Sequence, residues 1–267
     1  MIKIFEMFQI PFMQRALVLS MVTGAFLSFL GVYVVLRRIV FVGICLSQIS
    51  ACGFAFGFLI GFDSQITSFA FVLLGILFFS FIKRMERLPQ ESITGMIYAL
   101  FAALSLLFVA KSAGAEASIL NILSGDILTI TEKQVYMTAG VIFLAAFFHY
   151  LFYRKFLFIS FDPETAVSTG INVKLYEFLF YFILGTVISF AIRSAGVLLT
   201  FGYLAAPASL ALLFRERMKD VFLFAVLTGL SATLIGLVLS FFWDLPSGTT
   251  IVALMGIAWF AGYIFKR

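Results

Sequence analysis

Long runs of apolar residues, separated by short polar stretches, dominate the sequence. A helix needs about twenty predominantly apolar residues to cross a membrane. Runs of this length, or close to it, occupy 15–36, 44–62, 66–82, 92–110, 134–153, 175–192, 195–214, 220–242 and 248–265. Several runs are short or interrupted by glycine, so the pattern predicts about eight or nine spans. The predicted fold class is all-α, a polytopic helical membrane protein with a single transmembrane domain over residues 1–267.

One polar stretch, residues 161–173, interrupts this pattern and predicts a helix of two to three turns outside the membrane. Asp162 can accept hydrogen bonds from the first backbone N–H groups, and Pro163 suits the first helical position. Glu164 lies where the helix dipole favours a negative charge, and Gly170 suits a left-handed helix end. The stretch is therefore a candidate contact for a partner protein. A capped surface helix that only connects two spans is the alternative interpretation.

Composition supports the membrane class and excludes others. Hydrophobic residues make up 63% of the chain and charged residues only 12%, with a mean hydropathy of +1.14. A soluble domain of this length could not bury so much apolar surface, so the surrounding medium is expected to be a lipid bilayer. The net charge of +5 does not indicate a nucleic-acid partner, because the basic residues cluster beside the spans.

The basic residues are divided unevenly between the two sides of nine predicted spans. One side receives Lys3, Arg15, Lys111, Lys133 and Arg193. The other side receives Arg37, Arg38, Lys83, Arg84, Arg87, Arg154, Lys155, Lys174, Arg215, Arg217, Lys219, Lys266 and Arg267. Because Lys and Arg concentrate in cytoplasmic loops, this division predicts an external N-terminus, with the C-terminus and residues 161–173 in the cytoplasm.

Small residues and one proline mark places where spans pack closely or deviate from a regular helix. Gly53, Gly57 and Gly61 are four residues apart and form one smooth helix face. Pro207 removes a hydrogen bond from the helix that contains it, and interrupted helices often line transport paths. Gly43, Gly53, Gly57 and Pro207 are therefore candidates for packing along a translocation path, and ordinary kinked packing has equal weight.

Sequence motifs for enzymatic chemistry are absent. No nucleotide-binding loop of the G-x-x-x-x-G-K-[ST] type occurs, so no ATPase activity, catalytic residue or bound cofactor is predicted. Acidic residues lie at span ends, which disfavours coupling to an ion gradient. The energy for active transport is thus expected from a separate subunit. His149 is the only histidine, and packing is favoured for it over a role as a ligand.

Several short motifs, in order along the chain, carry a resemblance to a known family. Each is weak alone, but their order and spacing together are specific. They are Leu30–Arg38 with Phe41–Gly43, Ser124–Leu128, Phe161–Ala166 with Gly170, Gly196–Leu199, Pro207–Ala208 and Asp244–Gly248. In these motifs the chain resembles, nearly from end to end, the permease subunit of bacterial ABC transporters for zinc, manganese or iron ions.

The resemblance implies an ATP-driven importer in the bacterial cytoplasmic (inner) membrane. Its parts would be two permease copies as a homodimer, cytoplasmic ABC ATPase subunits that use the ATP, and an external substrate-binding protein that delivers the metal. The resemblance also implies that residues 161–173 form the coupling helix, with contacts from Asp162, Pro163, Glu164, Ala166 and Gly170. Two alternatives stay open, namely a stand-alone channel or gradient-driven carrier, and a family member that has lost its metal site.

The second span departs from the family pattern at two positions. The family usually has Gly-Asp-x-x-Ser-His there, and an acid and a histidine four residues apart would offer two metal ligands on one helix face. In this sequence Ile44 replaces the acid and Gln48 replaces the histidine. Ile44 offers no ligand and Gln48 only a weak neutral oxygen. The metal site implied by the resemblance therefore cannot be assigned to these positions.

Two cysteines provide the remaining candidate ligands. Cys45, Gln48 and Cys52 follow one another at helical spacing and share a face, and thiolates suit a soft ion. The two cysteines are, however, about 10 Å apart along the helix, too far to bind one tetrahedral ion. Packing is favoured for both cysteines, a disulfide is not expected, and the identity of the transported ion stays open.

Overall fold

The computed structural model describes residues 10–81, 89–112 and 131–266, and helices are the only regular elements in those ranges. The all-α prediction is therefore confirmed for the described residues. The helices are α2 (Pro11–Leu36), α3 (Val40–Ile60), α4 (Ser64–Phe81), α5 (Gln90–Lys111), α7 (Glu132–Phe161), α8 (Pro163–Ser168), α9 (Val173–Phe214), α10 (Met218–Trp243) and α11 (Ser247–Lys266). The Ser124–Leu128 motif and the basic residues Lys83, Arg84 and Arg87 lie outside the described residues.

Most of these helices are long and apolar enough to cross a membrane. Seven described helices meet that condition, and the apolar stretch Ser64–Ser80 of α4 is slightly shorter. A straight helix of the 42 residues in α9 would be about 63 Å long, roughly twice the thickness of the hydrocarbon core. A single straight crossing therefore cannot account for α9.

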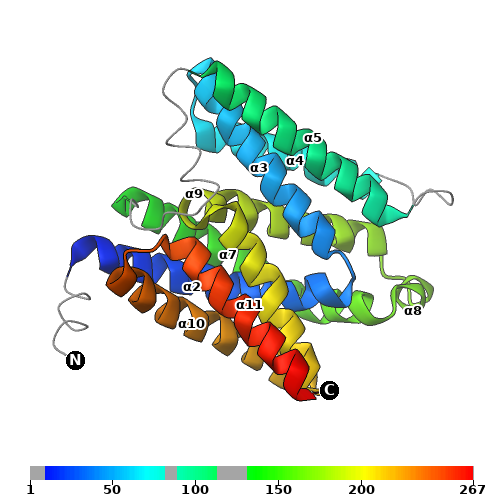
Figure 1. Ribbon diagram of the computed structural model, residues 1–267. Coiled ribbons are helices and arrows are strands. Elements are labelled where there is room, and N and C mark those ends of the chain that lie inside the picture. Colours follow the sequence, from blue (N-terminus) through cyan, green and yellow to red (C-terminus); the bar gives the residue numbers. More distant parts are fainter. Residues whose placement is uncertain (1–9, 82–88, 113–130, 267) are drawn as a thin grey trace.

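A break at Gly196 divides α9 into two halves that run in different directions. Gly196 has φ 78° and ψ 170°, a backbone conformation that residues with a side chain rarely adopt. The chain reverses direction there, so the first half runs toward one end of the bundle and the second half returns (Figure 1). The two halves are the spans expected at 175–192 and 195–214. With α4 and both halves included, nine described segments traverse the bundle.

Of the two interpretations left open for Pro207, the structure shows no interruption of the helix at this residue. Pro207 is buried in the second half of α9, and Gly196 is the only residue with non-helical dihedral angles inside α9. Proline removes one backbone donor and imposes a φ near −65°, which a helix can accommodate. A positive φ, by contrast, ends the helical path. The interruption therefore lies at Gly196, eleven residues earlier in the sequence.

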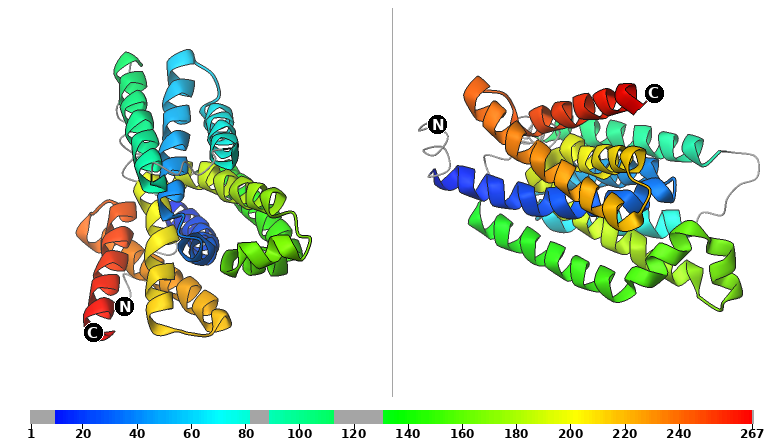
Figure 2. Two further views of the ribbon diagram at one scale, coloured as in Figure 1. Left: turned by 90° about the vertical axis from the view of Figure 1, so that its right-hand side faces the viewer. Right: turned by 90° about the horizontal axis from the view of Figure 1, so that it is seen from below.

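The helices form two groups that meet at α9. α3 packs on α4 and α5, whereas α2 packs on α9 and α10, and α11 packs on α9 and α10. Both groups contact α9, which lies between them (Figure 2). The start of α2 and the end of α11 lie at opposite ends of the bundle, and α8 lies at the same end as the end of α11 (Figure 1). We call this end the α8 end.

α7 is longer than the span expected at 134–153. Its 30 residues correspond to about 45 Å, which exceeds the hydrocarbon thickness of about 30 Å. The extra turns lie at the α8 end and contain Arg154 and Lys155, which the sequence placed in a loop. The helix therefore carries α8 away from the apolar part of the bundle.

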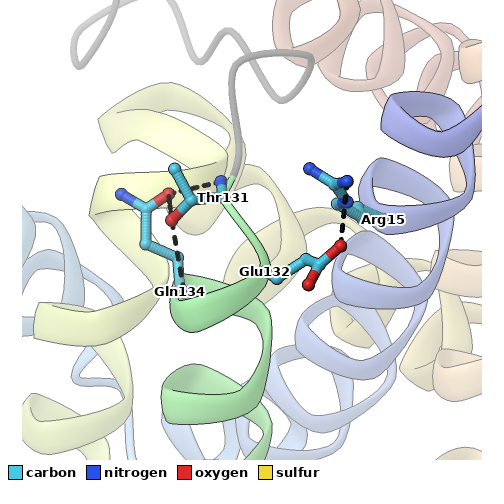
Figure 3. Close-up of polar contacts among 4 residues, drawn as sticks. All are labelled: Arg15, Thr131, Glu132 and Gln134. Atoms are coloured by element: carbon cyan, nitrogen blue, oxygen red, sulfur yellow. Dashed lines mark hydrogen bonds and ion pairs between the residues drawn. The ribbon is translucent and has the colours of Figure 1, made fainter.

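The opposite end of α7 is fixed by local polar contacts (Figure 3). The Thr131 side chain accepts a hydrogen bond from the Gln134 backbone N–H at 3.4 Å, and Gln134 Oε1 accepts from the Thr131 backbone N–H at 2.8 Å. Arg15 of α2 forms an ion pair with Glu132 at 3.0 Å. Because both charged side chains are partly exposed, this pair stabilises the fold by about 1 kcal/mol or less.

Candidate functional site

α8 begins with the N-cap that the sequence predicts. Asp162 Oδ1 accepts a hydrogen bond from the Thr165 backbone N–H at 2.9 Å, and the Thr165 hydroxyl donates to Asp162 Oδ2 at 2.5 Å. These bonds hold the pKa of Asp162 below its usual value, so the carboxylate stays ionised at neutral pH. Pro163 occupies the first helical position and Glu164 lies in the first turn. The predicted start of this helix is confirmed.

The end of α8 is equally well defined and lies at Gly170, where the sequence predicts a left-handed helix end. Gly170 has φ 81°, its N–H donates to the Val167 carbonyl at 3.0 Å, and the Ile171 N–H donates to the Ala166 carbonyl at 3.1 Å. This pair of bonds is the Schellman arrangement, which terminates a helix. The helix therefore has only six residues, Pro163–Ser168, rather than two to three turns over 161–173.

α8 presents most of its surface to the outside of the molecule. Ala166 is its only buried residue, and it faces the main body of the chain. Pro163, Glu164 and Val167 are exposed, and Val167 is 61% exposed. An exposed valine beside a carboxylate on a helix with fixed ends suits insertion into a groove of another protein. Nothing within the described chain covers this face.

Arg37, at the end of α2, joins the helices on either side of α8. Its Nε–H donates to Ser160 Oγ at 2.7 Å, and its Nη2–H donates to the Phe156 carbonyl at 3.1 Å, both on α7. The guanidinium carbon lies 4.2 Å from the centre of the Phe180 ring on α9. The sequence predicted only a topological role for Arg37, because these partners are more than a hundred residues away.

The candidate path residues of α3 are buried. Cys45 is 1% exposed and its thiol donates to the Thr94 carbonyl of α5 at 2.8 Å. Gln48 is 4% exposed, and Cys52 is fully buried. Among the described residues, no three His, Cys, Asp or Glu side chains are close enough to bind one ion together. A role of Cys45, Gln48 and Cys52 in a path stays a prediction.

Buried hydroxyl groups connect α3, α4 and α9 at a position that the sequence did not single out. The hydroxyls of Ser50 and Ser68 are 2.7 Å apart, and those of Ser68 and Ser189 are 3.3 Å apart. Gln65 Nε2 donates to the Ser189 carbonyl at 3.2 Å. Single serines in apolar runs are common, so only the tertiary structure brings these neutral polar groups together.

The glycines in and next to α3 have different structural roles. A Cβ atom on Gly53 would lie 2.6 Å from the Ser68 Cα, and one on Gly57 would lie 2.7 Å from the Ser64 Cα, so both permit the close contact of α3 with α4. Gly61 instead ends α3 with φ 68°. A Cβ atom on Gly43 would lie 3.4 Å from the nearest atom, an ordinary contact distance. A path role of Gly43, Gly53, Gly57 and Pro207 stays a prediction.

His149 is a packed residue in the described structure, as the sequence favoured. It is 2% exposed, and its ring lies between aromatic rings whose centres are 4.8–5.2 Å away, those of Phe29, Tyr33 and Phe156. Neither of its ring nitrogens makes a hydrogen bond to the described residues. Aromatic packing therefore accounts for its position among the described residues.

Comparisons with known proteins agree with this architecture. Residues 9–266 match the family model described as the ABC 3 transport family. The manganese transport system membrane protein MntC of Listeria monocytogenes is 26% identical over 257 residues, which cover 96% of this chain and 91% of the relative. A protein named probable iron transport system membrane protein, from Haemophilus influenzae, is 26% identical over 98% of this chain and 92% of its own length.

A solved structure has the same fold. The structure of PsaBC from Streptococcus pneumoniae in complex with Fab contains a chain with a TM-score of 0.88 and 25% identity, covering 98% of this chain and 95% of that one. The family match extends over almost the whole sequence, from before the start of α2 to the end of α11. The chain belongs to the ABC 3 transport family and is the membrane permease component of an ABC transport system, without an ATPase activity of its own.

Proposed function

We propose that this permease imports a divalent metal ion, with manganese as the first candidate and iron or zinc as alternatives. The proposal is supported by relatives of similar length whose names specify manganese or iron transport. The match to the ABC 3 transport family supports the partners as well. We propose that two copies of this chain pair with cytoplasmic ATPase subunits and receive the metal from an external binding protein.

The observation that carries this proposal is the exposed, capped helix α8. It lies at one end of the bundle, packs mainly on α7 and α9, and leaves an apolar and acidic face uncovered by the described chain. A partner that moves α8 would move the ends of two membrane-spanning helices. ATP hydrolysis in the partner could thereby change which side of the membrane the bundle opens to.

The proposed orientation places α8 in the cytoplasm. Of the described Lys and Arg residues, those at the α8 end are Arg37, Arg38, Arg154, Lys155, Lys174, Arg215, Arg217, Lys219 and Lys266. Those at the opposite end are Arg15, Lys111, Lys133 and Arg193. The excess at the α8 end supports a cytoplasmic location for α8 and the C-terminus, because cytoplasmic loops concentrate positive charge.

The test is purification of the chain with its co-expressed ATPase, followed by reconstitution into liposomes with the binding protein. We expect ATP hydrolysis that rises with manganese-loaded binding protein, and uptake of radioactive Mn²⁺ that requires ATP. Parallel assays with Fe²⁺ and Zn²⁺ identify the preferred ion. Uptake without ATP would favour a channel or carrier. Assembly without metal-stimulated hydrolysis would favour a family member that no longer transports.

The departure at the second span gives a separate prediction about the path. Converting Ile44 to Asp and Gln48 to His places an oxygen and an imidazole ligand on one face of α3. If the path follows α3, this double variant should bind Mn²⁺ or Zn²⁺ about tenfold or more tightly than the unmodified chain. A tenfold change requires only about 1.4 kcal/mol of additional binding free energy from the two added ligands. The measurement is equilibrium metal binding by the detergent-solubilised chain.

The matched control converts Ile257 to Asp and Phe260 to His, two exposed positions of α11 at helical spacing. This control adds the same groups outside the proposed path and should bind less metal than the α3 variant. Equal metal affinity in the α3 variant and the unmodified chain would show that this face of α3 does not line the path.

A further inference from the structure

α8 contacts few parts of the bundle, so a movement of α8 can act on the bundle at only a few places. α8 packs mainly on α7 and α9, and Ala166 is its only buried residue. α7 ends at Phe161 and α9 begins at Val173, so both are connected to α8 through a few residues. A displacement of α8 therefore reaches the end of α7 and the start of α9 first.

The end of α7 and the start of α9 are held to each other by a direct contact. Lys155 Nζ of α7 donates a hydrogen bond to the Tyr176 hydroxyl of α9 at 2.5 Å and lies 4.7 Å from the centre of the same ring. Arg37 makes a polar contact that extends from these ends to another helix, α2.

The Arg37 guanidinium uses its edge and its face at the same time. Its edge donates hydrogen bonds to Ser160 Oγ and the Phe156 carbonyl in the last turns of α7, and Ser160 Oγ also donates to that carbonyl at 2.6 Å. Its face lies over the Phe180 ring of α9. A planar guanidinium can do both, whereas a lysine ammonium cannot.

α2 extends this connection to the rest of the molecule. It packs on α9, α10 and α7. A Cβ atom on Gly31 would lie 2.3 Å from the Leu204 carbonyl oxygen in the second half of α9, and one on Gly24 would lie 2.9 Å from the Tyr203 ring. Such close packing transmits displacement because it leaves little free volume. We propose that Arg37 is a positioning residue that transmits movement of α8 and the α7 end to α2, and that it thereby couples ATP hydrolysis to transport.

This inference rests on the proposed function, and its test compares variants in the reconstituted permease–ATPase complex. The quantity measured is radioactive Mn²⁺ taken up per ATP hydrolysed. Arg37→Gln should lower this ratio about 2-fold to 30-fold, the usual range for a residue on a coupling route. Arg37→Lys keeps the charge but not both contacts, so its ratio should fall between those of Arg37→Gln and the unmodified complex.

The adjacent Arg38 supplies the control. It is exposed, and its side chain makes no hydrogen bond or ion pair within the described residues. Arg38→Gln removes the same charge at the same end of α2 and should leave the ratio unchanged. A purely structural role of Arg37 would lower the yield, hydrolysis and uptake together and leave the ratio constant.

A second variant tests the proposal even if the Arg37 variants do not fold. Ser160→Ala removes one acceptor of the guanidinium and keeps Arg37 itself, so it should lower the ratio in the same direction by a smaller factor. The proposal is overturned if Ser160→Ala and every Arg37 variant that assembles keep the unmodified ratio, or if Arg38→Gln lowers it as much as Arg37→Gln. An unmodified complex without ATP-dependent uptake would instead refute the proposed function.

Discussion

Converting Asp162 to Ala and Gly170 to Pro in one chain should abolish most ATP-driven uptake while the membrane bundle stays folded. The Ala side chain cannot accept the hydrogen bond from the Thr165 N–H that starts α8. Proline cannot adopt the φ of 81° found at Gly170, and it lacks the N–H that donates to Val167. A helix of six residues is too short to persist without defined ends.

We expect Mn²⁺ uptake to fall about 5-fold to 150-fold, the usual size of the coupling between two linked sites. ATP hydrolysis should lose its response to the metal-loaded binding protein. A control, Thr131→Ala, removes a helix cap of the same kind from α7 at the opposite end of the bundle. It should keep uptake close to the unmodified value. If the double variant transports at the unmodified rate, α8 is not the coupling element.

Gly31→Val should strongly destabilise the membrane bundle. The added Cβ atom would lie 2.3 Å from the Leu204 carbonyl oxygen and 2.9 Å from its carbonyl carbon, both backbone atoms that cannot rotate away. α2 and the second half of α9 would have to separate. Overpacking of this kind costs typically about 1–3 kcal/mol, and more where backbone must move.

This cost corresponds to a decrease of about 2–12 °C in the midpoint of thermal unfolding. The measurement is the unfolding midpoint of the purified chain in detergent. Gly140→Val is the matched control, because Gly140 lies inside α7 and a Cβ atom there would have nothing within 4 Å. The control makes the same change in helix propensity without the clash. Equal midpoints for the two variants would show that α2 and α9 can separate without cost.

The sequence determined the class of the protein and the ends of α8. A run of about twenty apolar residues must form a helix in lipid, because no water is available to satisfy its backbone groups. The roles of Asp162, Pro163 and Gly170 were predictable because capping involves residues within one turn of each other. The bounds 161–173 were too wide for α8, because they include the last residue of α7 and the first residue of α9.

The sequence located the reversal in α9 between the predicted spans 175–192 and 195–214, but it did not identify the residue at which the helix is interrupted. Pro207 and Gly196 both disfavour a regular helix, and sequence rules give proline the greater weight. The structure places the reversal at Gly196, because only there does the backbone take a positive φ within α9. Which of the two residues interrupts a helix depends on what packs around each, and packing is not a local property.

The contacts that connect helices were decided by the tertiary structure alone. The Ser50–Ser68–Ser189 hydroxyls and the partners of Arg37 are widely separated in sequence, and each residue by itself fits an ordinary span or a topogenic charge. The metal path also could not be deduced, because Ile44 and Gln48 replace the family's ligands and nothing local indicates a substitute. Hydrophobicity and helix capping act over one or two helical turns, so the sequence determined the spans and the ends of α8. Side-chain contacts between helices depend on how those helices pack, so only the folded chain decided these contacts.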